Sequence, residues 1–259
     1  MNEIMRSTVG RTLSQGIRDG RRDLLSYRPV ELKTGISANA EGSAHVKIGT
    51  TEVFVGVKLA VERPYPDTPN KGMLAVNTEL LPLSSPEFET GPPAILAIEL
   101  SRVVDRGIRE SGYLDMDKLN ITPGEESWSI FIDICTLNSD GNLFDAAALG
   151  ALVALRDAKF PKREGKKLNY KEHKGKLPLK EMPISVTVLK IGSHLLVDPD
   201  REEEEVYDAR LTVAVLPDGN LCALQKGGDA PLSFDDIERM VSIAQDKSKE
   251  LRKLVESVR

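Results

Sequence analysis

Three arginines are spaced so that they could bind an anion together. Arg102, Arg106 and Arg109 follow one another at i, i+4 and i+7, so on a helix they lie within an arc of about 60°. Like charges this close repel each other by a few tenths of a kcal/mol per pair on an isolated helix, and an anionic partner would offset that cost. The pattern alone permits two interpretations, a phosphate-binding stripe or a solvated face paired with neighbouring acidic residues. Those neighbours are Glu99, Asp105 and Glu110.

A run of carboxylates stands in the last quarter of the chain. Asp198, Asp200 and residues 202–205 are acidic, and Asp208 closes the run. Oxygen ligands gathered at the end of a strand could hold Mg²⁺. Composition alone nevertheless favours a solvated charge run in a loop over a metal site.

Residues 138–142 form a polar, glycine-containing turn in front of an apolar segment. The amino terminus of a helix that follows such a turn can bind an anion. Here the turn and the first helical residues carry Asp140 and Asp145 but no Lys or Arg, which disfavours phosphate. We therefore interpret the turn as helix capping.

The composition is that of a folded globular chain of one or two domains, with 259 residues, 40% of them hydrophobic and 29% charged. A net charge of −5 and only 5% aromatic residues argue against a stand-alone RNA-binding module, but permit a local basic patch. Two distant cysteines and three scattered histidines predict a reducing, cytoplasmic compartment and no zinc site. No membrane span or signal peptide is expected, and the motifs of P-loop, Rossmann and serine or zinc hydrolase sites are absent.

The elements that must position these side chains come in two similar blocks. The first predicts strands at 31–37, 44–48, 51–61, 72–80 and 125–137 and helices at 3–19, 94–110 and 143–158. The second predicts strands at 184–191, 194–197, 209–216 and 221–225 and a helix that Ser233 caps and that runs to about 257. The Lys-rich and Gly-containing segment 160–180 between them predicts a linker or a long exposed loop. This order indicates an α+β fold with mixed or antiparallel sheets.

Several of these segments, in this order, resemble the RNase PH family over roughly residues 16–257. The resemblance rests on the segment 16–21 followed by Arg28 and Pro29, on residues 40–53, on the arginine-bearing helix and on the acidic motif at Asp198. Within the family, the chain is most similar to the larger, non-catalytic ring subunit of the archaeal exosome. The resemblance implies an RNase PH fold, in which a domain like the second domain of ribosomal protein S5 precedes an RNase PH C-terminal domain. We expect an N-terminal helix and arm over 1–28, domain 1 over 29–180 and domain 2 over 181–259.

The chain departs from the family where active members hold phosphate. Their Gly-(Ser/Thr)-Arg turn is replaced by Asp140, Gly141 and Asn142, so the arginine is missing. Asp198 matches a family acidic position, whereas Glu204 stands where active members carry Asp. Holding an attacking phosphate beside a phosphodiester needs cationic and amide donors. We therefore expect no catalytic residues, no metal and no cofactor in this chain. Phosphate, with Mg²⁺ as a further candidate, would serve a catalytic partner.

The resemblance also implies partners. These are a catalytic RNase PH-like subunit in a hexameric ring built as a trimer of heterodimers, RNA-binding cap subunits and single-stranded RNA. Arg102, Arg106 and Arg109 are then expected to bind RNA, with Arg109 as a candidate for pairing with a carboxylate instead. The alternative function is a phosphate-dependent 3′-to-5′ exoribonuclease in its own right. Whether the Lys-rich segment 162–180 touches RNA stays open at this point.

Overall fold

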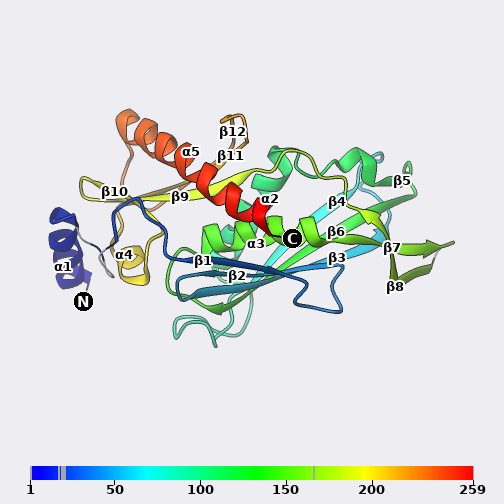
Figure 1. Cartoon of the computed structure of the whole chain (residues 1–259), viewed down its shortest axis with the longest axis horizontal. Helices are drawn as coiled ribbons and strands as arrows, with labels where there is room; N and C mark the ends of the chain where they lie inside the picture. Colours follow the sequence, from blue (N-terminus) through cyan, green and yellow to red (C-terminus); the bar gives the residue numbers. More distant parts are fainter. Residues whose placement is uncertain (1, 17, 19–21, 166, 259) are drawn as a thin grey trace.

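The computed structural model describes residues 2–16, 18, 22–165 and 167–258 and confirms an α+β fold with two main sheets (Figure 1). Its first half contains α1 (Asn2–Ser14), β1 (Val30–Thr34), β2 (Gly42–Ile48), β3 (Thr51–Glu62), β4 (Met73–Glu79), α2 (Ile95–Glu110), η2 (Met116–Leu119), β5 (Asn120–Thr122), β6 (Glu126–Asn138) and α3 (Leu143–Asp157). Its second half contains β7 (Lys159–Glu164), β8 (Lys167–Lys176), β9 (Ile184–Ile191), β10 (His194–Val197), α4 (Arg201–Val206), β11 (Ala209–Val215), β12 (Leu221–Gly227) and α5 (Phe234–Ser257). None of the described helices is both long and apolar enough to cross a membrane.

The larger sheet has the strand order β1-β2-β3-β6-β4, with β5 paired to β6. All its pairs are antiparallel except β4 with β6, so the predicted mixed character is confirmed. β2 and β3 meet at the predicted turn, where Gly49 adopts a left-handed φ of 59° that glycine tolerates without a Cβ penalty. Alternate residues of β3 and β6 are buried, which places one face of this sheet on the core.

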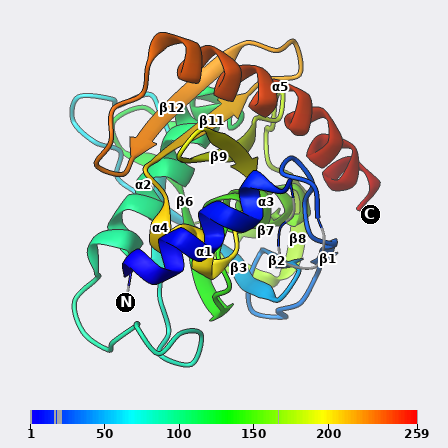
Figure 2. The same cartoon turned by 90° about the vertical axis from the view of Figure 1, so that its left-hand side faces the viewer.

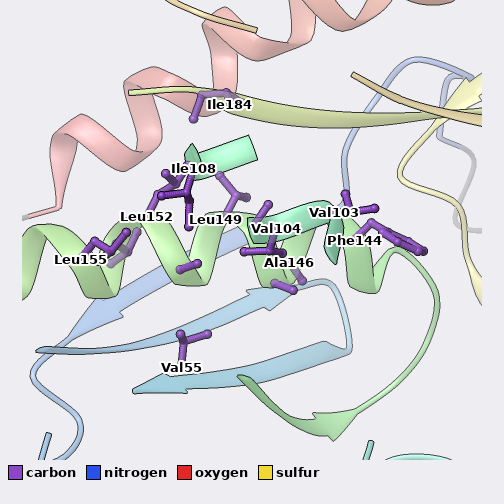
Figure 3. Close-up of a cluster of buried hydrophobic side chains, with 14 of the residues drawn as sticks. Val55, Val103, Val104, Ile108, Phe144, Ala146, Leu149, Leu152, Leu155 and Ile184 are labelled. Atoms are coloured by element: carbon purple, nitrogen blue, oxygen red, sulfur yellow. The ribbon is translucent and has the colours of Figure 1, made fainter. Parts of the chain in front are cut away.

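Helix α3 is the centre of the molecule, because it lies between the larger sheet and β9 of the second sheet. Figure 3 shows Val55 of β3 on one side of α3 and Ile184 of β9 on the other. All residues of α3 from Leu143 to Leu155 are buried, as its small, apolar composition predicted. A Cβ on Gly150 would come within 2.5 Å of Val55 Cγ2, so the helix approaches β3 closely only because this position is glycine.

The second sheet has the strand order β10-β9-β11-β12, and all its pairs are antiparallel. Helix α5 packs on β9 and β11 and begins with the predicted cap, a capping box between Ser233 and Asp236. Helix α1 lies beside α4, and Figure 2 shows it crossing in front of that helix. Val9 and Leu13 of α1 pack there with Val206 and with residues of β9 and β10 in a small separate core.

Three sequence-based expectations were wrong. Segment 160–180 is not a loop, because β7 and β8 pair as an antiparallel hairpin whose exposed faces lack an apolar alternation. The helix expected at 3–19 ends at Ser14, and Gly16 turns left-handed at φ 68°; residues 17 and 19 lie outside the described part of the chain. The acidic run is not a solvated loop, because residues 201–206 form α4 behind a capping box of Asp200 and Glu203.

Candidate functional site

Asp198, the acidic position singled out in the sequence, is fully buried and fully engaged. Arg28 Nε and Nη2 donate to its two carboxylate oxygens at 2.9 and 2.8 Å, and the Arg28 backbone N–H donates at 2.7 Å. Arg22 Nη1 and Asn142 Nδ2 each add a bond of 2.9 Å. Burial alone would raise the pKa of Asp198, but the hydrogen bonds and the charge of Arg28 outweigh it and hold that pKa below its usual value.

The same Arg28 side chain fills the turn that precedes α3. Its Nη1 donates to the Asp140 carbonyl oxygen at 2.7 Å and to the Asp140 carboxylate at 3.2 Å. Gly141, at φ 81°, lies so close to the acidic segment that a Cβ would meet Pro199 O at 2.4 Å. The turn therefore presents carbonyl oxygens and a carboxylate to an internal cation, which is the opposite of what a bound phosphate requires.

The side-chain carboxylate of Glu204, a residue of α4, caps the amino terminus of α3. The backbone N–H of Asn142 donates to Glu204 Oε1 at 2.8 Å, whereas Asn142 makes no side-chain cap of its own and has a left-handed φ of 59°. The capping predicted for residues 138–142 is thus supplied from α4. A helix amino terminus favours negative charge, and here the negative charge is a carboxylate of the protein itself.

Asp145, in the first turn of α3, is the third member of a carboxylate cluster that we define as Asp145, Asp198 and Glu204. It is fully buried, and the Tyr27 hydroxyl donates to its Oδ2 at 2.6 Å. Burial raises the pKa of Asp145 to about 7 and that of Glu204 to about 7, and the bonds from Tyr27 and from the Asn142 N–H only partly oppose this. Tyr27 was not singled out in the sequence.

The carboxylate cluster does not fit a metal ion. The Asp198 oxygens are taken up by two guanidinium groups and two N–H donors, and Glu204 caps a helix. No set of three His, Cys, Asp or Glu side chains within the described ranges could hold a metal. Glu203 of the acidic run is also occupied by an internal cation. Its buried carboxylate accepts two hydrogen bonds from the buried Arg18 guanidinium, at 2.7 and 2.5 Å.

The arginine stripe lies on the exposed face of α2, as predicted, while its opposite face is buried. Arg109 donates two hydrogen bonds to the carboxylate of Asp105, at 3.0 and 2.7 Å, which raises the pKa of Arg109. In the described part of the chain, Arg102 and Arg106 have no such partner, because Glu99 accepts a bond of 2.5 Å from Arg210 instead. A neighbouring carboxylate therefore neutralises Arg109, whereas the charges of Arg102 and Arg106 are not neutralised in this way by any described residue.

Arg102 and Arg106 border a groove of about 350 Å³ between α2 and β12, which we call the arginine groove. Gln225 of β12 lines it on one side, and Ile95 and Ile98 line it near the start of α2. Ile95 is 85% exposed and Ile98 49%. The two guanidinium groups are suited to binding an anion, and the exposed apolar side chains beside them are suited to contact with another macromolecule.

Comparison with known families gives two matches that together cover most of the chain. Residues 26–161 match the 3′ exoribonuclease family, domain 1, and residues 181–247 match domain 2 of the same family. Among curated proteins, the exosome complex component Rrp42 of Methanopyrus kandleri is 47% identical, covering 98% of this chain and 96% of that protein. The Rrp42 of Pyrococcus furiosus is 44% identical, covering 97% and 92%.

Solved structures agree with these relatives. A chain of the Archaeoglobus fulgidus exosome with RNA bound to the active site superposes with a TM-score of 0.91 at 43% identity, covering 97% of both chains. A chain of an archaeal exosome core superposes with a TM-score of 0.88 at 40% identity, covering 98% and 97%. Rice Rrp46 shares only the fold, with a TM-score of 0.71 at 16% identity.

Proposed function

This chain belongs to the 3′ exoribonuclease family of RNase PH domains, and on that premise we propose that it is a non-catalytic subunit of an exosome ring. Its relatives are named exosome components, and a similar chain belongs to an exosome with RNA at the active site. The proposed role is to complete the ring, to shape the active site of a catalytic partner and to hold RNA phosphates. The ring degrades RNA from its 3′ end with inorganic phosphate.

The observation that carries the non-catalytic assignment is the hydrogen bond from the Asn142 N–H to Glu204. Phosphorolysis needs phosphate held by preorganised donors beside the scissile bond. Here the donor at the α3 amino terminus is satisfied by Glu204, and the Arg28 guanidinium is satisfied by Asp198 and Asp140. Phosphate could enter only by displacing the carboxylates of Glu204, Asp140 and Asp198 from their partners, and for the buried Asp198 this costs several kcal/mol.

We assign the phosphate and Mg²⁺ requirements of the reaction to the partner. Neither phosphate nor Mg²⁺ suits the carboxylate cluster of this chain, so both belong to the catalytic subunit of the proposed ring. This chain instead shapes the active site of its partner and supplies positive charge for RNA phosphates. We assign the ring to the cytoplasm, in keeping with the free thiols of Cys135 and Cys222.

Arg102 and Arg106 are the proposed contacts to RNA phosphates. Both guanidinium groups are exposed and border the arginine groove, and arginine's planar fork binds phosphate oxygens in pairs. Arg109 is proposed as a weaker contact, because it would have to give up its two bonds to Asp105. The exposed Ile95 and Ile98 at the same groove supply apolar area for the catalytic partner.

Assembly with a catalytic RNase PH-like subunit tests this function. We expect the two purified proteins, mixed at equal concentration, to elute together with the mass of a hexamer and to degrade a labelled oligoribonucleotide faster than the partner alone. RNA-binding cap subunits should then associate with the ring. Separate elution, together with an unchanged rate of the partner, would contradict the proposed function.

A further inference from the structure

The β7–β8 hairpin is a projecting arm without a core of its own. Figure 1 shows it extending from the end of the molecule opposite α1. Every residue from Tyr170 to Lys176 is exposed, so both faces of this part of β8 meet solvent. An isolated two-stranded hairpin is marginally stable in water, so this one depends on contacts at its base. Its exposed polar surface offers little apolar area to a protein partner.

The base of the hairpin is held by aromatic contacts. The rings of Trp128 and Phe160 lie 4.9 Å apart, and the Tyr170 hydroxyl donates to the Leu59 carbonyl at 3.5 Å. Lys58 Nζ lies 4.8 Å from the centre of the Tyr170 ring. The register jumps from Pro161–His173 to Lys162–Asn169, so residues 170–172 bulge from the pairing. The arm is thereby fixed to β3 and β6 while its polar side chains stay outside.

The charge of this arm is opposite to that of the chain. Residues 159–176 contain eight Lys or Arg and two Glu, although the whole chain has a net charge of −5. Two of these cations form ion pairs among the described residues. Lys162 pairs with Glu164 and Glu172 of the hairpin, and Arg163 pairs with Glu126 of β6. The exposed lysines that no described carboxylate pairs with are Lys159, Lys167, Lys171, Lys174 and Lys176.

We propose that the β7–β8 hairpin is a second RNA contact, which binds the phosphate backbone of single-stranded RNA without reading its sequence. The inference rests on the proposed function, because that function makes RNA the substrate of the assembly. Unpaired lysines along an extended strand can each neutralise a phosphate, and lysine is depleted from protein–protein interfaces. None of the described hairpin residues lines the arginine groove, so the same strand of RNA could be held at two places on one subunit.

Matched lysine substitutions test the hairpin. The test variant is Lys171→Gln with Lys174→Gln, and the control is Lys249→Gln with Lys253→Gln on the exposed face of α5, which removes the same charge. The full chain and the reconstituted ring are titrated against a fluorescein-labelled 20-nucleotide oligo(A) between 50 and 300 mM NaCl by fluorescence anisotropy. Thermal melting of each variant confirms folding, since these side chains do not touch the core.

We expect the hairpin variant to bind about tenfold more weakly at 150 mM salt and to lose roughly 1.4 from the slope of log affinity against log salt. The control should change affinity less than twofold. Equal loss in test and control, or loss in neither, would overturn the inference. A hairpin variant that binds RNA normally but fails to join the ring would also overturn it, as a protein-docking surface.

The arginine variant Arg102→Gln with Arg106→Gln separates this inference from the proposed function. If it weakens RNA binding and the hairpin variant does not, the proposed function stands and the hairpin contact is wrong. If only the hairpin variant weakens binding, the hairpin contact stands and the proposed role of the groove fails.

Discussion

The backbone N–H of Asn142 and the carboxylate of Glu204 are joined by a hydrogen bond of 2.8 Å at the amino terminus of α3. This bond fills, from within the chain, the position where a helix amino terminus attracts an anion. Together with the Arg28–Asp198 pair, it converts a potential phosphate site into a self-satisfied core. The chain keeps the fold of its family, and we propose that this bond closes the site to phosphate.

Raised pKa values make the stability of the chain depend on pH in a defined direction. The pKa values of Asp145 and Glu204, each about 7, lie above their ordinary values, so between about pH 4 and 7 the folded chain binds more protons than the unfolded chain. Their contribution to stability is therefore fully present at low pH and is lost as pH rises toward 7. Asp198, with its lowered pKa, acts in the opposite sense, and only in more acidic solution.

Glu204→Gln should reduce this dependence, because the amide still accepts the Asn142 N–H but carries no charge at any pH. We expect the melting temperature of the natural chain to fall between pH 5.5 and 7.5 more steeply than that of the variant, measured by scanning fluorimetry. Glu202→Gln, which changes an exposed carboxylate of the same helix, serves as the control. Equal slopes in all three proteins would show that Glu204 is charged throughout this range.

Loss of Arg28 should destabilise the fold. Arg28→Met leaves the buried Asp198 with fewer donors, and breaking a buried ion pair in this way costs about 3 kcal/mol. Urea denaturation measures the change. As a matched control, Lys249→Met breaks the exposed pair with Asp246 and should leave the denaturation midpoint almost unchanged. A shift as small as that of the control would mean that Arg28 does not neutralise the site.

The two unpaired arginines should matter more for RNA than the paired one. In the reconstituted ring, Arg102→Gln and Arg106→Gln should each weaken oligo(A) binding about fourfold at 150 mM salt, which is the effect of one lost phosphate contact. Arg109→Gln removes the same charge from the same helix, but its guanidinium is held by Asp105, so we expect less than a twofold effect. Anisotropy titrations compare the three, and equal losses would contradict the distinction.

The buried elements of the fold could be predicted from the sequence, because periodicity reports burial. The apolar stripe of α2, the alternation in β6 and the small residues of α3 all marked their faces correctly. The β7–β8 hairpin and α4 were missed because neither shows an apolar period along the sequence. An exposed hairpin has no apolar alternation, and a six-residue helix is stabilised by its capping box and by contacts distant in sequence.

The site was only partly predictable. The missing arginine beside Asn142 and the acidic position Asp198 could be found only through the resemblance to the RNase PH family, whereas the spacing of the stripe was enough to place it on the exposed face of α2. The pairing could not, because Arg28 and Asp198 are 170 positions apart and only the tertiary fold joins them. The chain did contain one usable signal, since Arg18, Arg22 and Arg28 stand within eleven residues of one another and offer positive charge for the acidic run.

Phosphorolysis by the purified chain tests the central claim most directly. A labelled oligoribonucleotide is incubated with the chain, phosphate and Mg²⁺, and release of nucleoside diphosphate is followed with and without a catalytic RNase PH-like partner. We predict no release by the chain alone and, with the partner, a rate above that of the partner by itself. Release by the chain alone at an enzymatic rate, abolished by Asp198→Asn in a variant that still folds, would contradict the account.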